Sequence, residues 1–459
     1  MTDHQKKFIA DSEIKAFDLE HRKTIAFNMS KYNAAVERGK KQYQNLSLAR
    51  RQAGYKKFRN IENLENALKD FEQNFRKRGG KVIWAQDADE ANKAVLDILK
   101  KRGVKLVVKS KSMVTEELNI DHFLLKNNIE SVETDLGEYI VQISEDKPYH
   151  IVTPVMHRSA RDIAGIFEKK FGLPANSTPE EITAFVRKTL REKFADAQAG
   201  ITGANFLVST TGSVALTENE GNGVLSASMP PVHIVIAGIE KVIENLEDLH
   251  LFWPLLSTFG TGQNLTTYNS IISGPQQSKE PDGPREMYVI LLDNGRSNLL
   301  TQTPQRRALS CIRCGACLNG CPVYHNIGGH TYGSVYSGPI GAVITPHLRG
   351  MADFKHLSYA TSLCGKCTEV CPVNIDLHEQ LLQNRNFSVR NKLTPGMENL
   401  GMLAWKKAMQ KSAWMDFGSA SLKNYAMKKV FGKSWGKRRD LPKIQKKSFR
   451  KLWKERNQE

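Results

Sequence analysis

The chain has 459 residues, of which 40% are hydrophobic and 25% are charged, so it is long enough for two or three domains and disorder throughout is excluded. Its longest apolar runs, such as residues 232–239, reach only strand length, which excludes a membrane-spanning helix of roughly 20 residues. The formal net charge is +18, but residues 401–459 alone hold 17 Lys or Arg against 4 Asp or Glu, a net +13, so the basic character belongs to the end of the chain.

Residues 1–80 are predicted to form an N-terminal helical segment. Apolar residues recur at spacings of three and four, as at Leu64, Leu68 and Phe71, and Gly79 and Gly80 end the pattern. The first residues mix acids and bases and lack the apolar core of a signal peptide, so a cytoplasmic location is expected.

Residues 81–300 alternate short β-branched runs with longer helical patterns, which predicts an α/β domain with a largely parallel sheet. The expected strands are 82–85, 105–108, 132–134, 150–153, 206–210, 214–216, 233–237 and 287–292. The expected helices are 88–102, 112–127, 159–171 and 179–197. Residues 177–181, Ser-Thr-Pro-Glu-Glu, are typical of a helix start with a cap, a proline and acids in the first turn.

The most distinctive part of this domain is residues 200–223, which predict a strand, a Thr-Thr-Gly-Ser turn, a second strand and a glycine-rich loop. One interpretation is a ligand loop, in which backbone N–H groups and Glu220 meet a small anionic or hydroxylated molecule. The other is a plain hairpin, in which glycine only supplies the positive φ that the turns require. The hairpin is favoured.

Three weaker signals lie in the same domain. Gly260-Thr261-Gly262 is a partial dinucleotide fingerprint with no strand before it, so it does not support a nicotinamide or flavin site. His233 is more simply a structural histidine than a base. His157 with Arg158 suits either an anion site or the cap of the helix that follows.

All seven cysteines lie in the next region, predicted as a module over residues 301–395. The first motif is Cys311-x2-Cys314-x2-Cys317-x3-Cys321-Pro322, the spacing of bacterial ferredoxins that bind two clusters. In that arrangement three thiolates hold one cluster, while the fourth points to the other. An odd number of cysteines confined to one region indicates ligands rather than a disulfide framework.

The second motif, Cys364-x2-Cys367-x3-Cys371-Pro372, matches the same pattern but lacks its first cysteine, and Thr361 stands in that place. By the crossed-ligand rule, the first cluster takes Cys311, Cys314, Cys317 and Cys371. The second cluster then takes Cys321, Cys364 and Cys367 and is one thiolate short.

This shortage leaves three outcomes for the second cluster: a [4Fe–4S] cluster with a non-cysteine or external ligand, a [3Fe–4S] cluster, or a cluster completed by a partner protein. Thr361 or Ser362 would be weaker ligands than a thiolate. Two [4Fe–4S] clusters, the second with an open or exchangeable corner, are favoured.

Zinc sites are the alternative, because C-x2-C pairs also bind zinc. The triple C-x2-C-x2-C spacing and the proline after each last cysteine favour iron–sulfur.

Clusters of this type transfer single electrons, and removal of a hydride or proton from carbon needs another group. No catalytic residue is assigned.

Residues 396–459 form a basic C-terminal extension that carries four of the six tryptophans: Trp405, Trp414, Trp435 and Trp453. Lysines with interleaved aromatic residues suit nucleic-acid contacts, but they equally suit an amphipathic helix on an acidic partner or a membrane surface. A solvated or partner-docking extension is favoured, and no nucleic-acid binding is expected.

With both cysteine motifs in hand, the chain resembles the lactate utilization protein B family of iron–sulfur LUD-domain proteins. The resemblance also lies in residues 109–118, in 203–206 with 211–213 and 219–223, in Pro230-Pro231-Val232-His233 and in the basic extension. It implies a LUD α/β domain, of the fold shared by ribose-5-phosphate isomerase and CoA-transferase-like proteins, fused to a helical dicluster ferredoxin-like module.

The resemblance further implies a non-autonomous oxidoreductase subunit that passes electrons in the oxidation of L-lactate to pyruvate. It implies two partners, one with cysteine-rich repeats and one with a LUD domain alone, and leaves the electron acceptor open. Two other functions remain as alternatives: a LUD-domain enzyme whose clusters are structural or redox-sensing, and a nucleic-acid-binding iron–sulfur protein.

Overall fold

The computed structural model describes residues 2–411, 414, 416–435 and 440–457. It divides into two compact units, Met1–Ser388 and Val389–Glu459. Where the apolar spacing predicted a helical segment, the first unit begins with four helices: α1 (Asp3–Ala16), α2 (Leu19–Gly39), α3 (Leu46–Glu62) and α4 (Leu64–Lys77). No helix within the described residues has both the length and the apolar character that crossing a membrane demands.

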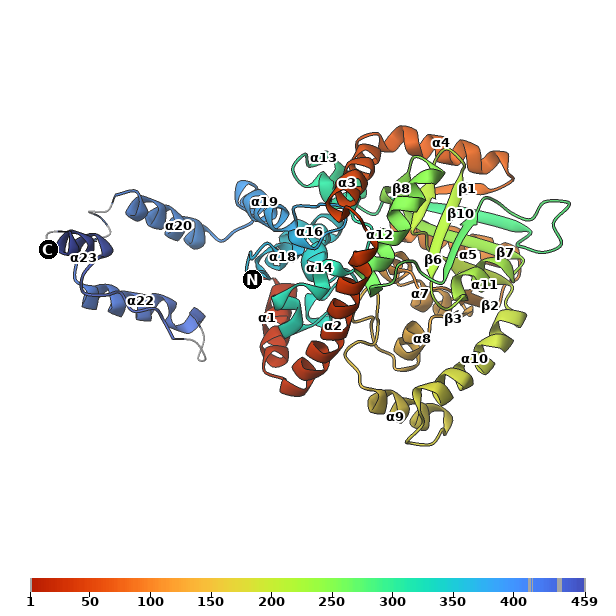
Figure 1. Ribbon diagram of the computed structural model, residues 1–459, viewed down its shortest axis with the longest axis horizontal. Helices are drawn as coiled ribbons and strands as arrows, with labels where there is room; N and C mark the ends of the chain where they lie inside the picture. The colour runs from red at the N-terminus through yellow and green to blue at the C-terminus, as the bar shows by residue number, and fades with distance from the viewer. Residues whose placement is uncertain (1, 412–413, 415, 436–439, 458–459) are drawn as a thin grey trace. The chain divides into compact units, whose positions relative to one another are not determined.

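A six-stranded parallel sheet in the order β1-β10-β7-β4-β2-β3 forms the centre of the α/β domain (Figure 1). Its strands are β1 (Lys81–Ala85), β2 (Leu106–Lys109), β3 (Glu130–Glu133), β4 (Ala199–Thr202), β7 (Val232–Gly238) and β10 (Glu286–Leu292). Every neighbouring pair is parallel, which confirms the predicted sheet type.

Both faces of this sheet are buried, as an all-parallel sheet requires. Along β7, Ile234 and Ile236 pack against one group of helices, while Val235 and Ala237 face α4 and a second sheet. The helices of the domain are α5 (Ala88–Lys101), α6 (Met113–Leu118), α7 (Ile120–Lys126), α8 (Leu136–Ile143), α9 (Ala160–Phe171), α10 (Pro179–Asp196), α11 (Asn222–Ser228) and α12 (Leu249–Thr261).

The second sheet has four strands in the order β8-β5-β6-β9. These are β5 (Phe206–Val208), β6 (Ser213–Glu218), β8 (Val242–Ile243) and β9 (Tyr268–Ile272). β5 and β6 pair antiparallel, so the predicted hairpin is present. Gly212, in its turn, has φ 60°, and a side chain there would meet the backbone of Phe75 at 2.2 Å, so this turn requires glycine.

The cap predicted for the helix at 179–197 is confirmed: the Thr178 side chain accepts from the Glu181 N–H, Glu181 bonds back to Thr178, and Pro179 opens the helix. Two expectations are wrong. The helix expected over 112–127 is divided, because Asn119 is left-handed with φ 51°. The strand expected over 150–153 is a turn, because His150 Nδ1 accepts the N–H groups of Val152 and Thr153, which a strand would offer to a neighbour.

The cysteine region is built from helices of four to six residues and two longer ones. The short helices are α13 (Arg296–Thr301), α14 (Ala316–Asn319), α15 (Pro322–Ile327), α17 (Met351–Phe354) and α18 (Lys366–Glu369), the longer ones are α16 (Gly338–Arg349) and α19 (Leu377–Arg390), and short 3₁₀ turns connect several of them. Helix α2 lies beside α14 (Figure 1), and both α1 and α2 contact α15.

The cysteine region does not have a core of its own. One apolar cluster, here called the shared core, joins it to the N-terminal helices and to part of the α/β domain. Its members include Ile25, Met29, Ala53, Phe206, Phe252, Phe259, Leu318, Tyr324, Val343, Leu357 and the buried cysteines. The cysteines are therefore held by three parts of the chain that are distant in sequence. The segment boundaries at residues 80, 300 and 395 remain predictions.

The second unit contains α20 (Gly396–Met409), α22 (Ala420–Trp435) and α23 (Phe449–Arg456). Neither α20 nor α23 buries a residue within the part of the chain that the structure describes.

Candidate metal centre

The two cysteine loops have the same backbone conformation. Arg313 has φ 63° and Gly315 has φ 80° in the first loop, and Leu363 has φ 54° and Gly365 has φ 80° in the second. A left-handed conformation is uncommon for residues other than glycine. Its occurrence at matching positions, each time before a four-residue helix, shows that the loops are structural repeats.

Thr361 occupies, in the second loop, the position that Cys311 has in the first. The Arg313 N–H donates to Cys311 Sγ at 3.4 Å, and the Leu363 N–H donates to Thr361 Oγ1 at 3.0 Å. The same turn is therefore closed by a sulfur in one loop and by a hydroxyl in the other.

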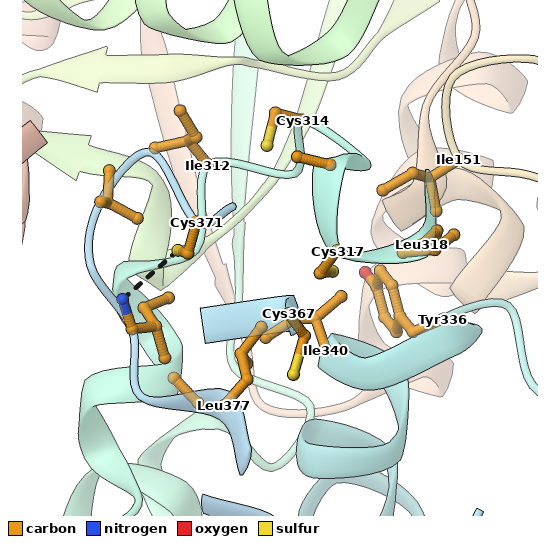
Figure 2. Close-up of a cluster of buried hydrophobic side chains, with 14 of the residues drawn as sticks. Ile151, Ile312, Cys314, Cys317, Leu318, Tyr336, Ile340, Cys367, Cys371 and Leu377 are labelled. Atoms are coloured by element: carbon orange, nitrogen blue, oxygen red, sulfur yellow. Dashed lines mark hydrogen bonds between the residues drawn. The ribbon is translucent and has the colours of Figure 1, made fainter. Parts of the chain in front are cut away.

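Four cysteines gather in a first group: Cys311, Cys314, Cys317 and Cys371. Burial raises the pKa of Cys317, and the neighbouring Cys311, Cys314 and Cys371 raise it further. Figure 2 shows Cys314, Cys317 and Cys371, together with Cys367 of the second motif, among apolar side chains of the shared core. Cys371 comes from the second motif, so this group crosses between the loops.

The other three cysteines form a second group. Burial raises the pKa of Cys367 to about 11, and Cys321 and Cys364 contribute to the rise. Cys321 comes from the first motif, so it is the reciprocal crossing residue. Cys364 is exposed, and the Lys366 N–H is the main cause of its lowered pKa. The second group therefore reaches the surface, whereas most of the first lies inside.

The surroundings of the cysteines fit an iron–sulfur cluster. The Ile375 N–H donates to Cys371 Sγ at 3.3 Å, drawn as a dashed line in Figure 2, and the Tyr324 N–H donates to Cys321 Sγ at 3.5 Å. Such bonds stabilise thiolates, and none of the seven cysteines is in a disulfide. Buried thiolates in one place repel one another unless a cation binds them, and soft sulfur ligands favour iron–sulfur clusters or zinc.

A buried ion network, here called the Glu240 network, lies against the first group. Arg296 binds Glu240 at 2.6 Å and Glu117 at 2.8 Å, and Arg313 binds Glu240 at 3.3 Å. Burial opposes ionisation of Glu240, but the two arginines outweigh it and lower its pKa to about 2. The network joins the α/β domain to the loop that carries Cys311.

Lys57, on α3, lies beside the Glu240 network. Lys57 is 1% exposed, and its ammonium donates to the carbonyl oxygens of Glu240 at 2.5 Å and Val242 at 2.8 Å. Burial lowers its pKa to about 7, whereas the charges of Glu240 and Cys311 raise it. A cluster bound by Cys311 would carry one more negative charge when it is reduced. Positive charges close to Cys311 would therefore stabilise the reduced state.

A cavity of about 380 Å³ lies beside the first cysteine group. Lys111, Asp135, Gly203 and Lys241 line it, each in a segment that follows the C-terminal end of a parallel strand (β2, β3, β4 or β7), and Cys314 closes another side. In open parallel α/β sheets, ligands bind outside the carboxyl ends of the strands. The cavity therefore has the usual position of a small-molecule site.

The loop at residues 219–223 lines this cavity, so the predicted hairpin is continued by cavity-lining residues. The backbone N–H groups of Gly223 and Val224 donate to the Glu218 carboxylate, at 2.8 Å and 2.9 Å. Glu220 instead accepts from the Leu136 N–H at 3.0 Å.

The weaker sequence signals have structural roles. His233 is fully buried and bonds Thr202 Oγ1 at 2.8 Å. Gly262 ends α12 in a left-handed conformation with φ 79°. His157 and Arg158 do not cap α9, which Ser159 caps; Arg158 binds Asp146 at 2.7 Å.

Sequence reasoning missed Lys111, Lys241 and Arg313 at the cavity. Two signals point to them in retrospect: Arg313 stands between two cysteines, and Lys241 is part of a charged pair that soon follows an apolar strand. Only the fold brings these three residues together.

Comparison with known proteins agrees with both parts of the first unit. A family model described as "LUD domain" matches residues 68–292, and one described as "4Fe-4S dicluster domain" matches residues 307–375. Proteins named "Lactate utilization protein B" from Bacillus cereus (strain AH820) and Bacillus anthracis (strain A0248) are each 44% identical over 406 residues, which is 86% of this chain and 85% of theirs.

The crystal structure of a DUF162 family protein from Deinococcus radiodurans is 14% identical, with a TM-score of 0.29, and covers 50% of this chain and 98% of its own. This likeness is too low to carry an argument about function.

Proposed function

The chain belongs to the lactate utilization protein B family, and on that premise we propose that it is the iron–sulfur electron-transfer subunit of a system that oxidises L-lactate to pyruvate. A role in lactate utilization and an iron–sulfur module follow from the relatives and the matched dicluster domain. The observation that carries the finer proposal is the pair of crossed cysteine groups, which lie in or against the shared core except for the exposed Cys364.

The first group, Cys311, Cys314, Cys317 and Cys371, would hold one [4Fe–4S] cluster. Cys321, Cys364 and Cys367 would hold the second. A bound cluster of this type supplies one-electron transfer. The chain's own contribution is to exclude water from the first group, to donate N–H bonds to Cys321 and Cys371, and to set cations beside Cys311.

Growth of the source organism tests this proposal. Deletion of the gene should abolish growth on L-lactate, and a copy encoding Cys317→Ser should fail to restore it while the native copy restores it. Normal growth of the deletion strain would contradict the proposal.

A LUD-domain enzyme with structural clusters is the second candidate, favoured by the cavity. In that case the purified chain alone would turn over substrate, and Cys317→Ser would spare that activity in folded protein.

The change Thr361→Cys is expected to close the open corner of the second cluster. Thr361 has the position of Cys311 in the repeated loop, and a thiolate binds iron more strongly than a hydroxyl. In the native protein, an added small thiol should alter the electron paramagnetic resonance (EPR) signal of the second cluster; in the variant this response should disappear.

Thr361→Ser, which keeps the hydroxyl, is the matched control and should respond like the native protein. An unchanged thiol response in Thr361→Cys would show that position 361 does not face the second cluster.

We propose that the second unit docks on an acidic surface of a partner, either the cysteine-rich-repeat subunit or the second LUD-domain subunit. Its described helices leave Leu400, Leu403, Trp405 and Trp453 about half exposed or more, although apolar side chains of this size are normally covered. Residues 401–459 also carry the net charge of +13. Together these features suit a surface that is both acidic and apolar.

A chain ending at Ser388 should therefore keep its iron but fail to co-purify with the partners. The double change Lys406→Glu and Lys407→Glu should weaken association, and the native association should weaken as salt rises. Lys100→Glu with Lys101→Glu, an exposed pair on α5, is the control and should associate normally. Normal partner binding by the shortened chain would contradict this assignment.

The grouped, unpaired cysteines are consistent with a reducing compartment, and we propose a cytoplasmic location.

A further inference from the structure

The cavity beside the first cysteine group has an electrostatic feature that the electron-transfer role does not use. Both acidic and basic side chains line it, but each acidic side chain already has a hydrogen-bond or ion-pair partner within the protein. Lys111 lies 3.5 Å from Asp135 and donates to the Val152 carbonyl at 2.7 Å. Glu218 and Glu220 accept backbone N–H groups at 2.8 to 3.0 Å.

Two cations at the side nearest Cys314 are left without full partners. Lys241 is 8% exposed and has no hydrogen bond or ion pair within the described residues, and its side chain lines the cavity. Arg313 binds Glu240 at 3.3 Å with one terminal nitrogen, while the other is buried without a partner. Tyr336 holds the guanidinium in place, with 4.5 Å between its ring and the guanidinium carbon.

A largely buried ammonium without a partner is costly, because it has lost most of its contact with water. Burial and the charge of Arg313 accordingly lower the pKa of Lys241 to about 8. An anion in the cavity would remove this cost by pairing with both side chains.

Neutral polar groups also line the cavity, beside apolar side chains such as Met113, Ile151 and Leu256. The Asn205 Oδ1 accepts from the Thr217 N–H at 2.9 Å, which aims the amide, and Ser112 lies at the turn where β2 ends. Gly203, which follows β4, leaves room for Ser112, because a side chain at position 203 would meet Ser112 Oγ at 2.5 Å. These groups are suited to a hydroxyl or carbonyl oxygen next to a carboxylate.

We propose that this cavity binds a small 2-hydroxy- or 2-oxo-carboxylate, whose carboxylate pairs with Lys241 and Arg313 next to the first cysteine group. This inference rests on the proposed function, because it assigns that function's substrate class to this chain. The cavity of about 380 Å³ is within the range of small-molecule sites and has room for such an acid together with water.

Binding is tested on the anaerobically purified, iron-containing full chain by titration calorimetry with L-lactate and with pyruvate. At least one should bind in the millimolar range or tighter. Lys241→Met should weaken this binding at least tenfold with iron content unchanged, and Lys241→Arg should retain part of it. Lys69→Met, an exposed lysine on α4 outside the cavity lining, should bind normally. Lys241→Gln replaces the methionine variant if that variant does not fold.

The midpoint potential of the first cluster gives a second readout. An anion beside it disfavours the added electron, so binding should lower the potential; a tenfold preference for the oxidised protein corresponds to 59 mV. Absence of binding at about 10 mM, tenfold above the usual upper range of substrate affinity, would overturn the inference, as would equal binding of acetate and phosphate. Iron-free protein would instead contradict the proposed function, so the two failures are distinguishable.

Discussion

Cys371→Ser is expected to remove the cluster of the first group, although Cys371 belongs to the second motif. Its sulfur lies with Cys311, Cys314 and Cys317, and a serine oxygen is a poor replacement for a thiolate on iron. Iron should fall from about eight to about four atoms per chain, since each cubane holds four. Cys321→Ser should remove the second cluster instead.

Two reference variants make this result decisive. Cys317→Ser defines the EPR spectrum of protein without the first cluster, and Cys367→Ser defines the spectrum without the second. Cys371→Ser should match Cys317→Ser, and Cys321→Ser should match Cys367→Ser. If Cys371→Ser matches Cys367→Ser, each motif holds its own cluster and the crossed assignment is wrong.

Arg296→Met is expected to cause a large loss of stability. The Arg296 side chain is 1% exposed and binds two buried carboxylates, Glu240 and Glu117. Removing one partner of a buried ion pair costs about 3–5 kcal/mol, because the remaining charge stays buried without compensation. The midpoint of urea unfolding, followed by circular dichroism under anaerobic conditions, should fall accordingly.

Lys69→Met is the control, because its pair with Glu65 on α4 is exposed and should leave the midpoint unchanged. Acid should affect the native protein in the same direction as Arg296→Met. The pKa of Glu240 is lowered from 4.5 to about 2, so its contribution is complete above pH 4.5 and is lost as pH falls toward 2. An unchanged midpoint for Arg296→Met would show that the network does not stabilise the fold.

The sequence was informative wherever one local pattern determined the outcome. β7 and β10 are continuous apolar runs, as strands buried on both faces must be, and they were predicted within a residue or so. β4 was missed because Gly200 weakens its strand pattern. The structure explains this glycine: a side chain would meet the Ser226 carbonyl oxygen at 1.7 Å, where α11 crosses the strand.

The candidate metal centre was visible in the sequence because cysteine spacing is local. The cavity was not, because its charged residues come from segments distant in the chain. Lys111 follows β2, Lys241 follows β7 and Arg313 lies in a cysteine loop, and only the strand order and the shared core bring them together. No periodicity or motif in the sequence predicts that these three side chains lie together.

The central claim is that this chain carries two iron–sulfur clusters, one fully ligated by cysteine and one lacking a thiolate. Its most direct test is EPR of the anaerobically purified protein, oxidised and reduced, with iron and zinc quantified. The account predicts about eight iron atoms per chain and two interacting [4Fe–4S] signals on reduction. About seven iron atoms with a [3Fe–4S] signal in the fresh oxidised sample would contradict the second cluster, and zinc without iron would contradict the whole account.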